Sequence, residues 1–220
     1  MSSEELYFNF HLILNKNASQ RNTEIPRAYF VSLYNREALN WLQDYIEKNS
    51  STQKIHNVQG LLTTNYKLNE VRKYEQYDVY SLPLRYFEFV GSRSLAKKGK
   101  CQRWINNYLP SPKNINVQLD DETPSFEYEE SVCNITENKL VVYKDKYEIN
   151  DTYLSYYMTP TKIDLSGYEN LNTGENSKTV DSDLDERYQN EIIDRVVLEV
   201  MREFENPNGF KLSQERIQTN

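Results

Sequence analysis

The sequence is poor in the residues from which most catalytic centres and covalent frameworks are built. Its 220 residues include 2 Cys, 2 His and 6 Gly. Cys101 and Cys133 have neither the number nor the spacing of a disulfide framework or a metal-binding pair. His11 lies in an apolar stretch and His56 in a polar one, and neither has Cys or carboxylate neighbours at metal-ligand spacing. The sequence therefore predicts a non-enzymatic protein with no catalytic residue, cofactor or metal site.

Phosphate-binding loops are also missing. The chain contains no GxxxxGKS/T or GxGxxG motif, and its few glycines leave little room for backbone to approach a phosphate closely. The acidic runs 120–122 and 181–186 could hold a hard cation, but they lack the alternating oxygen ligands and central glycine of a calcium loop. We interpret them as solvated turns and as charge at a helix N-terminus.

No apolar run reaches the roughly 18 residues of a membrane-spanning helix, so we expect no contact with a membrane. The first ten residues, MSSEELYFNF, are acidic where a signal peptide would be basic, so we expect synthesis in a reducing cytosol. The net charge of -7 argues against a general affinity for nucleic acid.

The charge is unevenly distributed along the chain. A basic stretch opposed only by Glu88 contains Arg85, Arg93, Lys97, Lys98, Lys100 and Arg103, whereas acid dominates beyond residue 120. This asymmetry predicts that the two ends of the protein meet different partners, although two solvated faces would give the same pattern. Trp104 and Tyr108 follow the basic stretch, a combination that can bind single-stranded nucleic acid. The overall acidity favours a solvated turn or an acidic protein partner instead.

Tyrosine is abundant, with 18 Tyr against 8 Phe and 2 Trp. A tyrosine buries a large ring and keeps a hydroxyl for a partner, so it is enriched at protein interfaces. A coding bias toward AT-rich codons, which raises Tyr, Asn, Lys and Ile together, is the alternative explanation.

Helical periodicity marks three segments. The first begins at Ser2 or Ser3, and the second has Thr23 as its cap and Pro26 in its first turn and runs to about residue 49. The third follows a cap at Asp181, Ser182 or Asp183. Their apolar stripes contain Leu6, Phe10 and Leu14; Phe30, Leu33, Tyr34, Ala38, Trp41, Leu42, Tyr45 and Ile46; and Tyr188, Ile192, Ile193, Val196, Val197, Val200, Met201 and Phe204.

Between the helices the pattern favours strands. Alternating or β-branched runs predict strands at 77–82, 115–119, 140–143, 147–149 and 153–158. Residues 84–95 are expected to form a short helix that buries Tyr86, Phe87 and Val90, and Gly99 to lie in a basic turn. The fold class is therefore α+β, with a helical body and an antiparallel β portion in the middle. We expect one domain over 1–207, helical at 1–57 and 183–207, mainly β at 58–165, with a loop at 166–182 and an extended C-terminal arm at 208–220.

Several segments of the second half carry a resemblance to a known family. They are PSFEY at 124–128, KLVVYKD at 139–145, LSYYMTPTKIDL at 154–165, EIID at 191–194 and ENP at 205–207. In this order the chain resembles the virion structural proteins of crAss-like and related Bacteroidetes phages. The likeness is strongest over 124–207, and the helix over 24–48 also resembles that family.

The resemblance implies a subunit of a head-to-tail connector ring, commonly of twelve copies, in the phage virion. Its partners would be copies of itself, the portal protein and the next tail ring protein, while genomic DNA would pass through without sequence-specific binding. By that likeness Phe210 and Leu212 of the arm would reach the portal or a neighbouring copy. The other candidate contact residues are Tyr143, Tyr147, Tyr153, Arg93, Lys97 and Lys98.

A ring subunit works by binding, so we also expect strand edges within 139–158 to pair between copies. The alternatives are another virion tail component, such as a tail hub or fibre-associated protein, and a cargo protein packaged in the particle. Outside these classes stand an unrecognised enzyme and a carbohydrate-binding or adhesion module, the latter suggested by the Tyr-rich strands.

Overall fold

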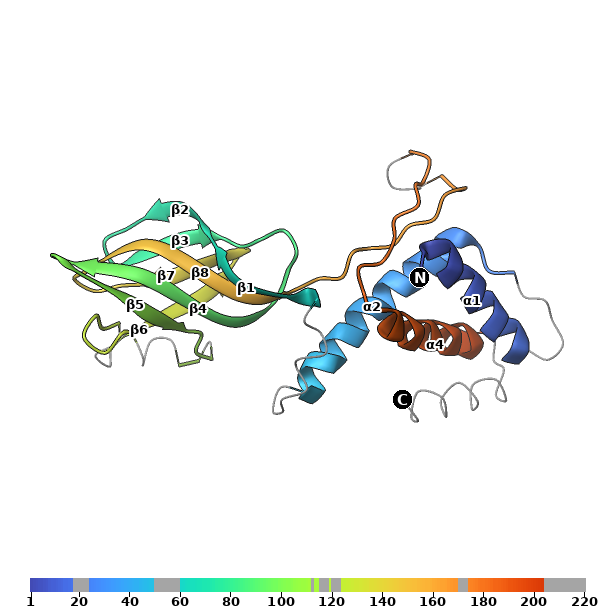
Figure 1. The fold of residues 1–220 in the computed structure, drawn as a ribbon, viewed down its shortest axis with the longest axis horizontal. Coiled ribbons are helices and arrows are strands. Elements are labelled where there is room, and N and C mark those ends of the chain that lie inside the picture. Colours follow the sequence, from blue (N-terminus) through green and yellow to red (C-terminus); the bar gives the residue numbers. More distant parts are fainter. Residues whose placement is uncertain are drawn as a thin grey trace. The chain divides into compact units, whose positions relative to one another are not determined.

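The computed structural model describes residues 1–17, 24–49, 60–111, 113–114, 119, 124–169 and 174–203. The chain divides into two compact units, which we call the helical unit (Met1–Gly60 and Pro160–Asn220) and the β unit (Leu61–Thr159) (Figure 1). The α+β class predicted from the sequence is confirmed. The single domain expected over 1–207 separates into two units, because the middle strands enclose a hydrophobic core of their own.

The helical unit contains α1 (Ser3–Asn17), α2 (Arg27–Asn49) and α4 (Glu186–Glu203). Helix α1 begins with a capping box, since Ser2 Oγ accepts a hydrogen bond from the Glu5 N–H (3.3 Å) and the Glu5 carboxylate accepts one from the Ser2 N–H (2.7 Å). Helix α2 follows Pro26 directly, and the Pro26 carbonyl accepts the first helical bond, from Phe30. The sequence predicted a cap at Ser2 or Ser3 for the first helix and placed Pro26 in the first turn of the second. The expected cap Thr23 lies outside the described residues.

Helix α4 packs against both N-terminal helices. Aromatic rings pair at two of the helix contacts. Between α1 and α2 the rings of Phe10 and Phe30 lie 4.9 Å apart, and between α2 and α4 those of Trp41 and Tyr188 lie 4.7 Å apart. The buried side chains are Leu6, Phe10, Leu14, Phe30, Leu33, Tyr34, Ala38, Trp41, Leu42, Tyr188, Ile192, Ile193, Val196, Val197, Val200 and Met201. These residues belong to the apolar stripes predicted from the sequence, and Tyr45 and Ile46 of the second stripe are half-buried. Phe204 lies outside the described residues.

In the segment 160–183, expected to contain an aperiodic loop, the described residues on either side of 170–173 pair as the two arms of a hairpin. Asp164 and Val180 exchange both backbone hydrogen bonds, at 3.1 and 3.0 Å. The hairpin docks on α2, where the Asn35 amide donates to the Ile163 carbonyl (3.0 Å) and accepts from the Ile163 N–H (2.8 Å). Side-chain bonds to backbone thus order a polar stretch that has no hydrophobic periodicity.

Two of the three residues expected to cap α4 bind other parts of the helical unit instead. The Asp181 carboxylate accepts the Ser3 N–H at 2.7 Å, and the Asp183 carboxylate accepts both the N–H and the hydroxyl of Thr161. The carbonyl of Asp185 accepts the Gln189 N–H and begins the helix instead. The acids before α4 therefore join the hairpin to its surroundings, which sequence spacing alone could not reveal.

The β unit is an eight-stranded sheet in the order β1-β8-β4-β5-β6-β7-β3-β2 (Figure 1). Neighbouring strands are antiparallel except β5 and β6, which are parallel. The strands are β1 (Leu62–Lys67), β2 (Asn69–Lys73), β3 (Tyr77–Ser81), β4 (Tyr86–Lys98), β5 (Cys101–Tyr108), β6 (Glu130–Thr136), β7 (Lys139–Tyr143) and β8 (Glu148–Met158). The first and last strands of this order, β1 and β2, are separated only by Leu68, so one bent segment serves both ends of a curled sheet.

Both strands of the region 139–158 have partners on each side. β7 pairs with β3 and β6, and β8 pairs with β1 and β4. Their backbone groups are therefore already used in the sheet, and the expectation that their edges pair between copies is wrong.

The short helix expected at 84–95 is also wrong, because these residues belong to the long strand β4. The pairing of β4 with β8 shifts register between Tyr86 and Glu88 and again between Phe89 and Gly91. A bulge inserts one residue and breaks the two-residue alternation of a strand, so the apolar spacing imitates a helix. Val90, expected to be buried, is 49% exposed.

Of the other strands, some were predicted from the sequence and some were not. β3, β7 and β8 fall on predicted runs, and Gly99 occupies the turn between β4 and β5 with a φ of 60°. β1 and β2 are mostly exposed and carried no signal. Residues 115–118 of the expected strand 115–119 lie outside the described residues, as does the arm 208–220.

An ion pair is buried in the β unit. The Lys144 ammonium lies 2.6 Å from Asp78, and the two side chains are 8% and 0% exposed. Burial raises the pKa of Asp78, and the hydrogen bond and charge of Lys144 oppose that rise. The second oxygen of Asp78 accepts no hydrogen bond among the described residues, so this carboxylate depends on Lys144.

We predict that Lys144→Met lowers the free energy of unfolding by about 3–5 kcal/mol, because it leaves a buried unpaired carboxylate. Asp78→Leu/Lys144→Met should recover most of that loss. A carboxyl with a raised folded-state pKa favours folding below its unfolded-state pKa and loses that contribution as the pH rises through the folded-state pKa. The loss in Lys144→Met should therefore shrink in acid. Urea unfolding at neutral and acidic pH tests this, and equal losses at both would contradict it.

We also predict that Asn35→Ala destabilises the helical unit by about 1–3 kcal/mol, because two hydrogen bonds to Ile163 are lost. Asn40→Ala, on an exposed position of the same helix, should change stability by about 0.5 kcal/mol or less. Hydrogen exchange of the Ile163 amide measures the effect locally, and unchanged protection in Asn35→Ala would show that the contact does not hold the hairpin.

Candidate interaction surface

The outward face of the curled sheet carries an aromatic and cationic cluster. In β4 and β5 the buried residues Ala96 and Ile105 point into the core, so their neighbours project outward. The Arg93 guanidinium carbon lies 4.5 Å from the centre of the Trp104 ring, and the rings of Trp104 and Tyr153 meet edge to face at 5.5 Å. We call these three residues the aromatic cluster.

Arg93 differs from most arginines of the described residues in having no recorded acceptor there. Arg27 pairs with Glu4, Arg36 with Glu199 and Arg195 with Asp44. Arg93 is exposed, stacks on Trp104 and has no hydrogen bond or ion pair recorded among the described residues. Stacking fixes the guanidinium plane while its N–H groups stay available for a carboxylate. The cluster is thus built to receive an acidic or carbonyl-bearing partner.

The surroundings of the cluster are mixed in character. Trp104 is 42% exposed and Tyr108, on the same face of β5, is 51% exposed. An ion pair between Lys67 and Asp151, 2.6 Å long, lies on β1 and β8. Aromatic surface beside polar groups is typical of protein interfaces.

The structure separates the contact residues expected from the sequence. Arg93 and Tyr153 are brought together, being opposite each other in β4 and β8. Lys97 and Lys98 lie at the end of β4 beside the Gly99 turn, where Lys98 pairs with Glu127 at 2.7 Å. They belong to the tip of the sheet rather than to the cluster.

Of the other residues expected to contact partners, one is buried in the core, one is half-buried and two lie outside the described residues. Tyr147 is 6% exposed and packs against Phe126 in the core, so its expected role as a surface anchor is corrected. Tyr143 is half-buried, and its ring contacts Tyr77. Phe210 and Leu212 lie outside the described residues. Trp104 is the member of the cluster that the sequence did not assign as a contact. The apolar residues of 101–108 stand at 101, 104, 105 and 108 and do not alternate, so the segment gave no clear strand signal.

A hollow of about 590 Å³ lies at the tip of the sheet. Its lining residues are Tyr74, Glu75, Lys97, Lys98, Gly99, Lys144, Asp145, Lys146, Tyr147 and Glu148. Its lining contains both lysines and carboxylates, so opposite charges offset each other. This mixture does not form the uniformly basic site that an anion would need.

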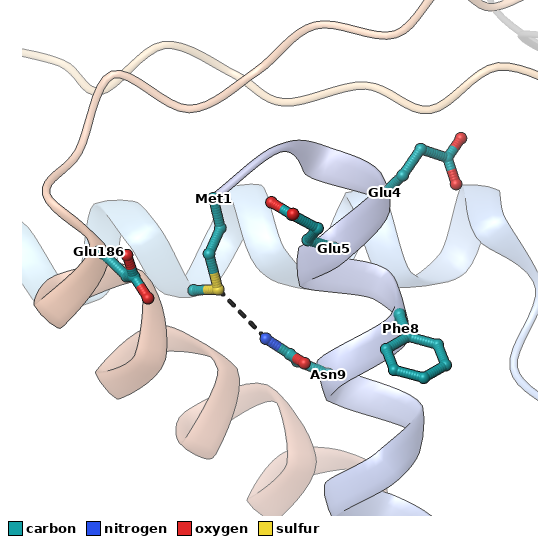
Figure 2. Close-up of a pocket in the computed structure, with 6 residues that line it drawn as sticks. All are labelled: Met1, Glu4, Glu5, Phe8, Asn9 and Glu186. Carbon is teal, nitrogen blue, oxygen red and sulfur yellow. Dashed lines mark hydrogen bonds between the residues drawn. The ribbon is translucent and has the colours of Figure 1, made fainter.

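A second surface occurs on the helical unit. Phe8 and Leu12, one turn apart on α1, are 62% and 54% exposed. A hollow of about 610 Å³, lined in part by Phe8, lies over the start of α1. Figure 2 shows Glu186 of α4 at one side of it. Its lining residues are Met1, Glu4, Glu5, Phe8, Asn9 and Glu186, and Asn9 donates to the Met1 sulfur at 3.1 Å. We call Phe8, Leu12 and this hollow the α1 surface. The sequence analysis did not identify it.

Groups able to do covalent chemistry are dispersed. Burial raises the pKa of Cys133 to about 12, which keeps this thiol protonated at neutral pH. His11 packs edge-on against the rings of Tyr7 and Phe10. Among the residues described above, no three metal-ligating side chains come together, and none of the helices is long and apolar enough to cross a membrane.

Comparison with the models of known protein families finds no match, and neither does comparison with curated proteins.

We predict that Trp104→Ala lowers the free energy of unfolding by about 1 kcal/mol or less, because half of its ring already faces solvent. Tyr156→Ala, on the inward face of β8 and 3% exposed, should cost about 3–5 kcal/mol through the cavity it leaves. Thermal and urea unfolding of the two variants measure this difference. A large loss in Trp104→Ala would mean that the cluster is part of the core and not a surface for partners.

Proposed function

We propose that this chain is a structural subunit of a phage head-to-tail connector ring, which docks below the portal and forms part of the DNA channel. It acts by binding and makes or breaks no covalent bond. It would be present in the virion, and in the host cytoplasm during assembly. Its partners are copies of itself, the portal and the next tail ring protein.

The observation that carries the proposal is the preorganised aromatic cluster on the β unit. Arg93, Trp104 and Tyr153 hold one another in place yet remain on the surface. Tyrosine, tryptophan and arginine are the residues most enriched at the energetic centres of protein interfaces. An exposed Trp beside an exposed Arg that has no ion pair among the described residues is best explained by a partner that covers both.

The resemblance to phage virion proteins gives this binding role its setting. The segment 139–145 falls on β7 and the turn after it, and 154–165 runs from β8 into the hairpin, where Ile163 and Leu165 are buried. The segment 191–194 lies on α4. Residues 124–128 form a turn in which Ser125 bridges to Glu130.

The charge of the chain suits a DNA channel. A net charge of -7 would repel the phosphates of passing DNA and keep it from adhering to the wall. The exposed lysines beside Gly99 would have to face away from the channel. The other virion roles, a further tail component or a packaged cargo protein, would share the binding chemistry and differ in position.

A second candidate function is carbohydrate binding, which the row of exposed rings on β5 and β8 favours. Sugar rings can pack on aromatic faces, and Asn106 and Gln102 are exposed on β5. The stacking of Arg93 on Trp104 counts against it, because the guanidinium covers a ring face that a sugar would use.

Purified full-length chain mixed with the portal of the same phage should form a complex of fixed copy number in native mass spectrometry. Deletion of the gene should leave filled or partly filled heads without attached tails, as seen by electron microscopy. Normal head-to-tail attachment after deletion would overturn the connector, and binding on a glycan array that Trp104→Ala abolishes would favour the second candidate.

A further inference from the structure

The chain carries two exposed surfaces of complementary character, one on each unit. The aromatic cluster presents a cation stacked on a ring, and the α1 surface presents apolar side chains beside carboxylates. We infer that the aromatic cluster of one copy docks on the α1 surface of a second copy. This inference rests on the proposed function, since it supplies the contact between neighbouring subunits of the ring.

The charges of the two surfaces match. Around the hollow, Glu4 is paired with Arg27 at 2.5 Å and Glu5 caps α1 through Ser2. Glu186 is exposed and has no ion pair recorded within the described part of the chain. On the β unit, Arg93 is likewise exposed and has no ion pair recorded among the described residues. A guanidinium and a carboxylate that both lack partners can form a bidentate, charge-assisted pair when the surfaces meet.

The apolar groups match as well. Phe8 and Leu12 have the four-residue spacing with which a helix presents anchors to a partner surface. Phe8 and Glu186 line the same hollow, and Figure 2 shows them flanking the first turns of α1, so an approaching surface would meet the ring and the carboxylate together. Arg93 and Trp104 offer a cation and a ring side by side for these two contacts. Docking would remove the exposed side chains of Phe8, Leu12 and Trp104 from water at once.

A second copy fits better than an unrelated partner because both halves of the contact are on one chain. The contact joins two different surfaces, so it is heterologous. In a pair of copies, one aromatic cluster and one α1 surface therefore remain free. Repetition of such a contact closes a ring when the rotation between copies allows it. The interface is therefore consistent with the cyclic assembly that a connector requires.

The test uses two full-length variants, each damaged on one surface. Variant one is Phe8→Asp/Leu12→Asp, and variant two is Arg93→Glu/Trp104→Asp. Wild-type chain should form species larger than two copies in native mass spectrometry and analytical ultracentrifugation. Each variant alone should stay monomeric, with association weakened roughly tenfold or more. A 1:1 mixture should give a heterodimer and nothing larger, because one intact pair of surfaces remains.

Matched controls separate this contact from general effects of added charge. Leu84→Asp and Lys139→Glu alter an exposed apolar and an exposed basic residue elsewhere, and should assemble like wild type. Circular dichroism confirms that the variants fold. As a second readout, Glu186→Arg should weaken association, and its combination with Arg93→Glu on the same chain should restore it.

Three outcomes would overturn the inference: a wild-type chain that stays monomeric, variants that assemble normally, or a mixture that stays monomeric. Finding the chain in particles at fixed copy number in any of these cases would leave the connector standing and remove only this interface. Conversely, assembly through these surfaces by a chain absent from particles would keep the interface and overturn the connector. Interaction of the cluster with another virion protein, but not with a second copy, would also overturn the inference.

Discussion

The architecture of the β unit depends on a single bend in the chain. Residues 62–73 run as β1 along β8, turn at Leu68 and continue as β2 along β3. Leu68 is 4% exposed and its N–H donates to the Thr152 carbonyl at 2.9 Å, so the bend is fixed by burial and by a hydrogen bond. Because one segment pairs with both ends of the strand order, the sheet curls around its own core. Without that bend, β8 and β3 would each expose a row of unpaired backbone groups.

Because the sheet is curled, only some parts of the β unit are available to bind a partner. β7 and β8 have partners on both sides, so recognition has to use side chains on the outward face instead of their backbone edges. Strand alternation places Ile105 inside and its neighbour Trp104 outside, where β4 brings Arg93 above the ring. The location of the aromatic cluster is thus a direct consequence of register. This is why the proposed connector works through a surface patch and not through strand addition.

Sequence reasoning succeeded where periodicity was regular. The stripes of α1, α2 and α4 were readable because burial on one face of a helix leaves a repeating pattern, and the run of β-branched and aromatic residues in β7 marked a strand. It failed at β4, where two bulges interrupt the alternation, and at β1 and β2, whose exposed residues leave no pattern. The sequence predicted two members of the aromatic cluster, Arg93 and Tyr153, as contact residues. It could not predict that they lie against Trp104, because that depends on the pairing of β4 with β5 and with β8. The α1 surface gave no signal, since an exposed Phe8 and Leu12 look like any other residues of an apolar helix.

The β unit begins and ends on adjacent strands, since Leu62 of β1 lies opposite Tyr157 of β8. Its two connections to the helical unit therefore leave from neighbouring points of one sheet. Insertions of this kind disturb the host fold little, because the gap they open in it is short. Evolution could then exchange the whole inserted module, giving a new recognition specificity to an unchanged helical scaffold.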